Sequence, residues 1–180
     1  GGMMARLAYV DLSAANHELR DLAERVAAER GGRLINQYRM LLHSPPIASA
    51  WLQFASAVRF QTTLDPASSE LAICCVTRLA GAEYPYRAHS RLALRHGVSH
   101  DQLGAISDWR ASSLFTRQQR AILSYAEALT LGAPVDADVF PELLEFFDER
   151  ALVELTVVIA FYLMVARFLG GLEIEPETEP

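Results

Sequence analysis

The chain has 180 residues, of which 51% are apolar, and its formal net charge is −6. This length predicts a single domain that buries most of its apolar surface. A negative chain without a run of basic residues argues against a nucleic-acid partner. No charged start is followed by an apolar signal segment, and Gly1–Gly2 ahead of the first Met is typical of an expression scar. We therefore expect a cytoplasmic protein.

Apolar residues at helical spacing fill the first third of the chain. They predict helices over residues 13–30 and 33–43, with Gly31–Gly32 between them. Ser44 and two prolines then open a helix that runs to about residue 60, because proline fits the first helical turn. Large apolar side chains are expected on the buried side of that helix: Trp51, Phe54 and Val58.

The centre of the chain, residues 65–96, reads as a helical hairpin. Asp65 is a good N-cap residue, and Pro66 fits the first helical position. The first helix is apolar on nearly every face apart from one carboxylate, Glu70. A helix of this kind is buried, so the carboxylate needs a partner. Gly81–Ala82 breaks the helix, and a second helix follows.

Glu70 and His89 are expected to form one site within this hairpin. Glu70 lies about ten residues before the turn and His89 about seven after it, so at 1.5 Å per residue their depths differ by only ~5 Å. Two side chains or one water molecule can bridge that distance. Two plainer interpretations stay open: Glu70 pairs with an arginine such as Arg78 or Arg87, and His89 is a satisfied core histidine.

The second half of the chain carries two capping boxes. Ser99 with Gln102, and Thr116 with Gln119, each place a hydroxyl three residues before a glutamine, which predicts two helix starts. A final helix is expected from about residue 149 to residue 169.

The final helix contains a strongly apolar stretch, residues 155–166. It is well short of the ~20 apolar residues that a membrane span needs, so we expect a core or subunit-contact helix and no membrane partner. Together with the apolar hairpin helix, it is too apolar for one small subunit to cover. We therefore expect a homo-oligomer, a trimer or a hexamer. The acidic tail over residues 173–180 is expected to be mobile.

No stretch of the chain alternates well enough to predict a strand. We predict an all-α fold with one domain over residues 5–172 and about eight helices around the central hairpin. Cys74 and Cys75 are the only cysteines. Neighbours on a helix point ~100° apart, so they do not form a thioredoxin-like pair. We expect buried structural thiols that are dispensable for activity.

The five histidines are the first candidates for a metal site. None forms a His-x-x-x-His or His-Glu-x-x-His arrangement. The chain also lacks a glycine-rich phosphate loop and a Gly-x-Ser-x-Gly turn. We expect no metal and no cofactor, which leaves acid–base chemistry on a small-molecule substrate.

Acid–base chemistry fits the polar residues of the hairpin. A buried Glu70 beside a neutral His89 is suited to moving a proton on a small substrate. Tyr84 and Tyr86, near the open end, could donate hydrogen bonds to an anionic oxygen. An arginine could hold a substrate carboxylate, the candidates being Arg39, Arg78 and Arg87. These residues alone would suit any proton-transfer enzyme.

The hairpin resembles the carboxymuconolactone decarboxylase family, which includes the alkyl hydroperoxidase D-like proteins. The resemblance rests on Glu70, on Ala82-Glu83-Tyr84, and on His89 with a glycine ending its helix. Residues 36–45 resemble the segment that precedes the core in this family, and residues 161–169 resemble its closing helix. The resemblance covers roughly residues 34–172, and it implies an all-α fold of the alkyl hydroperoxidase D-like type.

The chain departs from that family at several positions. Ala82 and Pro85 stand where the hydroperoxidase branch has a Cys-x-x-Cys pair, so the redox pair is absent. Tyr84 stands where that branch has a second histidine. Leu163 follows Tyr162 where related members often have an asparagine, so any role of that amide is missing.

The resemblance and the chemistry of the residues together indicate roles for seven residues. Catalytic roles are expected for Glu70, His89 and Tyr84. Substrate-binding roles are expected for Tyr86, Arg87, Glu83 and Arg39.

Three functions of different class follow. The first is a cofactor-free decarboxylase or related lyase that acts on a small cyclic carboxylic acid such as a lactone. The second is a peroxide-linked oxidoreductase of the hydroperoxidase kind, which the missing cysteine pair disfavours. The third is an oligomeric protein that binds a small ligand without turning it over, which the departure at Leu163 favours slightly.

Overall fold

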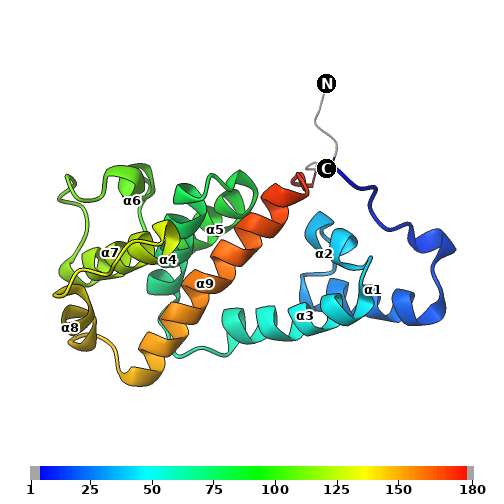
Figure 1. Cartoon of the computed structure of the whole chain (residues 1–180), viewed down its shortest axis with the longest axis horizontal. Coiled ribbons are helices and arrows are strands. Elements are labelled where there is room, and N and C mark those ends of the chain that lie inside the picture. The colour runs from blue at the N-terminus through cyan, green and yellow to red at the C-terminus, as the bar shows by residue number, and fades with distance from the viewer. Residues whose placement is uncertain (1–4, 178–180) are drawn as a thin grey trace. The chain divides into compact units, whose positions relative to one another are not determined.

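The computed structural model describes residues 5–177 (Figure 1). Over this range the chain forms nine α-helices, two short 3-10 helices and no β-strand, which confirms the all-α class. The helices belong to two compact units. The first unit takes the residues up to Gln61 and those from Leu169 on, and the second comprises Thr62–Phe168. The single domain over residues 5–172 stays a prediction, and each unit is described by itself.

The first unit contains three α-helices. After a 3-10 turn at Leu12–Ala14, they are α1 (His17–Glu29), α2 (Asn36–Leu41) and α3 (Pro45–Phe60). The first helix begins later than expected because Asn16 caps it, accepting a hydrogen bond from the backbone N–H of Leu19 at 2.9 Å. Both α1 and α2 pack against α3.

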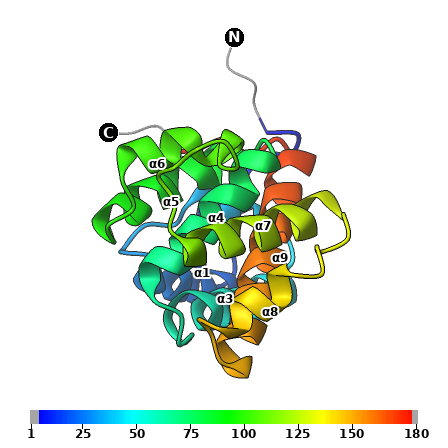
Figure 2. The same ribbon diagram turned by 90° about the vertical axis from the view of Figure 1, so that its left-hand side faces the viewer.

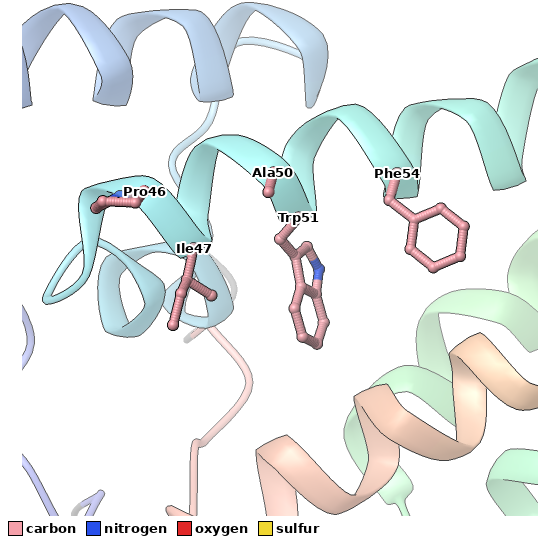
Figure 3. A pocket seen from close by; sticks show the side chains of 5 residues that line it. All are labelled: Pro46, Ile47, Ala50, Trp51 and Phe54. Atoms are coloured by element: carbon pink, nitrogen blue, oxygen red, sulfur yellow. The ribbon is translucent and has the colours of Figure 1, made fainter.

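The buried side of α3 differs from the expected one. It consists mainly of small residues: Ala48, Leu52, Ala55 and Val58. Phe54 is 46% exposed, and it projects from the same side of α3 as Ile47 and Trp51 (Figure 3). Small side chains allow neighbouring helices to approach closely. A prediction based on large apolar side chains therefore selected the wrong face of α3 as the buried one. Only Val58 of the three predicted residues is fully buried.

The second unit is built on the predicted hairpin. Its helices are α4 (Pro66–Leu79), α5 (Glu83–Arg95), α6 (His100–Ala105), α7 (Arg117–Leu131), α8 (Val139–Leu144) and α9 (Glu149–Gly171), with a 3-10 turn at Ile106–Asp108. Both predicted capping boxes are present, at Ser99 and at Thr116. The last residues of α9 belong to the first unit.

Helix α4 lies at the centre of the second unit. It packs against α5 and α7 along its length (Figures 1 and 2). Asp65 caps α4 by accepting the backbone N–H of Ser68 at 2.9 Å, so Glu70 is not needed as a cap. The hairpin turn contains Gly81 at φ +67°, a left-handed conformation that favours glycine. This turn reverses the chain so that α5 returns along α4.

Helix α9 is the longest helix of the described chain. Among the residues that the structure describes, it alone is long and apolar enough to cross a membrane. Half of its most apolar 18-residue stretch is buried inside the protein. Core helices of soluble proteins share this composition. The absence of a membrane partner stays a prediction.

The acidic tail contacts α2 within the first unit. Arg6 pairs with the carboxylate of Glu173 at 2.8 Å. The carboxylate of Glu177 accepts the backbone N–H of Asn36 at 2.6 Å, at the start of a helix that has no side-chain cap of its own. Residues 173–177 of the tail that we expected to be mobile thus make contacts, and residues 178–180 lie outside the described range.

Candidate active site

Glu70 and His89 meet across the α4–α5 hairpin. Nδ1 of His89 lies 2.6 Å from Oε2 of Glu70. The two side chains are nearly buried, with 9% of the imidazole and 13% of the carboxylate exposed. The contact predicted from their similar depth in the hairpin is therefore present. A short contact between a carboxylate and an imidazole anchors the ring at Nδ1.

The second ring nitrogen of His89 is left for a substrate. Nε2 makes no hydrogen bond with the residues that the structure describes. It is also not among the buried polar atoms that lack a partner, so it keeps access to solvent. An ionised Glu70 accepts the proton on Nδ1 and places the exchangeable position at Nε2. The arrangement can donate or accept one proton at a defined atom.

Tyr162 packs edge to face against the imidazole of His89. The ring centroids are 4.5 Å apart, and the ring planes are inclined by 76°. Tyr162 belongs to α9 and is only 3% exposed. The sequence placed this tyrosine in the closing helix without a role in the site. Its place in a strongly apolar helix predicted that the ring is buried. Spacing within one helix could not predict its contact with His89, which lies 73 positions earlier in the chain.

The two tyrosines at the start of α5 have different surroundings. Tyr86 is buried, and its hydroxyl donates to the carbonyl of Leu103 at 3.3 Å, so its one donor proton is used there. The guanidinium of Arg78 lies over its ring, 3.9 Å from the centroid. Tyr84 is half-buried. A contact of Tyr84 with substrate stays a prediction.

The two arginines predicted to hold a substrate are engaged elsewhere. Arg87 pairs with Glu83 at 3.0 Å on the exposed side of α5, a contact that i, i+4 spacing predicts. Arg39 belongs to the first unit, where its guanidinium lies over the ring of Tyr9 at 4.8 Å. Substrate-binding roles for Arg87, Glu83 and Arg39 stay predictions.

Residues 45–128 match the model of the carboxymuconolactone decarboxylase family, and this range includes both helices of the hairpin. Over this range the chain is similar to the carboxymuconolactone decarboxylase family. Its Glu70–His89 contact lies inside the matched range.

One sequence relative matches a longer part of the chain. The uncharacterized protein YnjA of Escherichia coli (strain K12) is 33% identical over 125 residues, which are 69% of this chain and 66% of that protein. The match therefore spans just under two thirds of the length of that relative.

Solved structures share the fold. An uncharacterized peroxidase-related protein from Ralstonia eutropha JMP134, described as an alkylhydroperoxidase AhpD core, has a TM-score of 0.79 at 18% identity, covering 98% of this chain and 94% of that chain. The debrominase Bmp8, as a cysteine-to-alanine variant with 2,3,4-tribromopyrrole, has a TM-score of 0.74 at 23% identity, covering 94% and 90%. At these identities the likeness shows the AhpD-like fold.

The two thiols of the chain lie away from the surface. Cys74 and Cys75 are unpaired and have no exposed area. Burial raises the pKa of each thiol to about 12. A thiol with such a pKa is a poor nucleophile near neutral pH. The structure thus places both cysteines as the sequence predicted, while their dispensability for activity stays a prediction.

Two hollows lie away from the Glu70–His89 contact. One, of about 230 Å³, surrounds the ion pair of Arg110 and Glu127 beside α7. The other, of about 440 Å³, lies on the exposed apolar side of α3 (Figure 3). Neither is lined by Glu70 or His89. Within the described range, no three His, Cys, Asp or Glu side chains gather as a metal site.

Proposed function

We propose that this protein is a cofactor-free acid–base enzyme that decarboxylates a small cyclic carboxylic acid, such as a carboxylated lactone. The observation that carries the proposal is the nearly buried contact of 2.6 Å between Glu70 and His89. The similarity of residues 45–128 to the carboxymuconolactone decarboxylase family supports the choice of decarboxylation among proton-transfer reactions. The substrate is a small molecule that reaches Nε2 of His89.

The proposed reaction needs one proton at one carbon. The bond between the ring carbon and the substrate carboxylate breaks, carbon dioxide leaves, and the electron pair passes into a dienolate. Imidazolium His89 donates the proton on Nε2 to the carbon, and Glu70 stabilises that imidazolium through Nδ1. Water then returns a proton to Nε2. Atoms and charge balance without an oxidant or a reductant.

A thiol-based oxidoreductase is less well supported. Ala82 and Pro85 stand at the hinge of the hairpin, where the hydroperoxidase branch has its two cysteines. The two cysteines that the chain does have are buried and carry pKa values of about 12. They lack the exposed, electropositive setting that lowers a thiol pKa.

The alternative function is a protein that binds a small ligand without turning it over. One position of the sequence, Leu163, favours this alternative. Leu163 replaces the asparagine of related members, so an amide is missing from the helix that brings Tyr162 to His89. A binding protein would keep the fold and lose the reaction. Turnover separates it from the decarboxylase.

The test is release of carbon dioxide from a panel of cyclic carboxylic acids, with 4-carboxymuconolactone included, run in deuterium oxide. We expect one substrate to lose carbon dioxide and gain one solvent deuteron at the former carboxyl carbon. Binding of panel members without release of carbon dioxide would replace the proposal with the binding protein.

We also propose that the protein is a homo-oligomer, a trimer or a hexamer. The exposed apolar side chains support it. They include Ile47 and Phe54 on α3 (Figure 3), and Val153 and Met164 on α9. Exposed apolar side chains in such number favour burial against another copy. Light scattering that shows a monomer at micromolar concentration would contradict this proposal.

A further inference from the structure

A second pair of side chains crosses the same hairpin. Arg78 lies in the last turn of α4, and Tyr86 lies one turn before His89 on α5. The guanidinium carbon of Arg78 is 3.9 Å from the centroid of the Tyr86 ring, a stacking distance. Tyr86 is buried and its hydroxyl is hydrogen-bonded to Leu103, so the ring is a fixed platform.

The N–H groups of Arg78 are uncommitted. The side chain is exposed, and within the described residues it makes no hydrogen bond and no ion pair. A guanidinium that stacks by its face keeps its N–H edges free in a fixed fork, which matches a carboxylate. Arg87 is different, because Glu83 already accepts from its Nε at 3.0 Å.

We infer that Arg78 is a carboxylate-binding residue of the Glu70–His89 site, and that its ligand is a small cyclic carboxylate. The inference rests on the proposed function and names the group that anchors the substrate. It selects Arg78 from the three candidates that the sequence offered, in place of Arg87 and Arg39. It also gives Tyr86 a role as the platform beneath the clamp instead of a donor to the substrate.

The position along the hairpin supports this assignment. Tyr86 and His89 are three residues apart, so the platform lies about 4.5 Å along α5 from the imidazole. Glu70, Cys74 and Arg78 follow one another at four-residue spacing on α4, and both charges act on the Cys74 thiol between them. A carboxylate held by Arg78 over the Tyr86 ring would therefore lie about one helical turn from the imidazole along α5.

The experiment measures the binding of benzoate and of its neutral analogue benzamide by isothermal titration. Wild type is compared with Arg78→Gln, Arg78→Lys, Arg87→Gln and the control Arg95→Gln. We expect benzoate to bind wild type and Arg95→Gln equally, and to bind Arg78→Gln at least about tenfold more weakly, because a charged bidentate contact is lost. Arg78→Lys restores little, since a lysine lacks the fork. Benzamide should bind weakly to all.

Several results would overturn the inference. The first is equal binding of benzoate by wild type and Arg78→Gln, and the second is a loss of benzoate binding confined to Arg87→Gln. The third is binding of benzamide to wild type as tight as that of benzoate. The fourth is no saturable binding of benzoate to wild type. Each titration is repeated on Glu70→Gln, which lacks the charged acid–base pair. Selective benzoate binding with no decarboxylation by wild type would contradict the proposed function alone. Decarboxylation that Arg78→Gln leaves unchanged in KM would contradict the clamp alone.

Discussion

The ring of Tyr162 lies edge to face on the imidazole of His89, with 4.5 Å between their centroids. Three helices thereby meet at one imidazole: α4 brings the carboxylate to Nδ1, α5 carries the ring, and α9 covers its side. The carboxylate contact leaves the imidazole free to tilt about the axis through Nδ1. A second contact from a nearly buried aromatic ring removes that freedom and fixes the direction of Nε2.

Replacing Tyr162 should therefore affect catalysis through the orientation of the imidazole. Tyr162→Phe keeps the ring and should retain most of the turnover. Tyr162→Leu loses it and should lower kcat about tenfold with little change in KM, the size expected for one aromatic contact at a positioned group. Nitrogen NMR should show the Nε2 signal of His89 broadened by motion of the ring in the leucine variant alone. Equal kcat values for the two variants would remove Tyr162 from the site.

The two buried thiols should make stability depend on pH in the alkaline range. Burial raises the pKa of Cys74 and Cys75 from 9.0 to about 12. The unfolded chain thus loses these protons first, and unfolding becomes more favourable as pH rises from about 9 towards about 12. Each thiol should remove about 1.4 kcal/mol of the unfolding free energy per pH unit in that window.

The double variant Cys74→Ala, Cys75→Ala is the matched control for this dependence. It should show a shallower fall in stability above about pH 9, because its tyrosines still titrate but its thiols are gone. At neutral pH it should be less stable by about 1 kcal/mol or more for each lost buried sulfur, with turnover unchanged. Loss of turnover in a folded double variant would show that a thiol takes part in the reaction.

The protein should not reduce peroxides with a dithiol donor. The positions that carry the redox pair in the hydroperoxidase branch are Ala82 and Pro85, and the remaining thiols are buried. Consumption of an alkyl hydroperoxide in the presence of dithiothreitol should equal that of the double cysteine variant. A rate that depends on Cys74 or Cys75 would place the protein with the oxidoreductases.

The hairpin turn should be sensitive to a side chain at Gly81. Its φ of +67° is left-handed, and a Cβ there meets no neighbouring atom within 4 Å, so the cost is one of backbone strain alone. Gly81→Ala should lower the unfolding free energy by about 1 kcal/mol in urea titrations. Gly104→Ala, in α6 with an ordinary φ and equally open surroundings, is the control and should be neutral or stabilising. Equal effects at both positions would contradict the strain argument.

Local chemistry in the sequence was sufficient to predict the hairpin and the contact at its centre. Asp65, the two capping boxes and Gly81 mark helix ends by hydrogen-bonding rules that act within a few residues. Counting residues from the turn then placed Glu70 and His89 at similar depth. The i, i+4 spacing of Glu83 and Arg87 also predicts their ion pair, although both residues were expected to bind substrate.

Contacts between distant segments could not be predicted in the same way. The partner of His89 on α9 depends on how three helices cross, and spacing within one helix carries no such information. The buried face of α3 was misjudged for the same reason. Its alanine side faces inwards because neighbouring helices pack there, whereas the pattern alone favoured the large side chain of Phe54.

The most direct test of the proposed acid–base pair is a double-mutant cycle on turnover of the substrate found in the panel. Glu70→Gln and His89→Ala should each lower kcat by roughly a hundredfold or more, and the double variant should be little worse than either, because the two side chains act as one unit. Circular dichroism and light scattering should show an unchanged fold and assembly. Undiminished kcat in Glu70→Gln, or effects that multiply in the double variant, would contradict the pair as the catalytic centre.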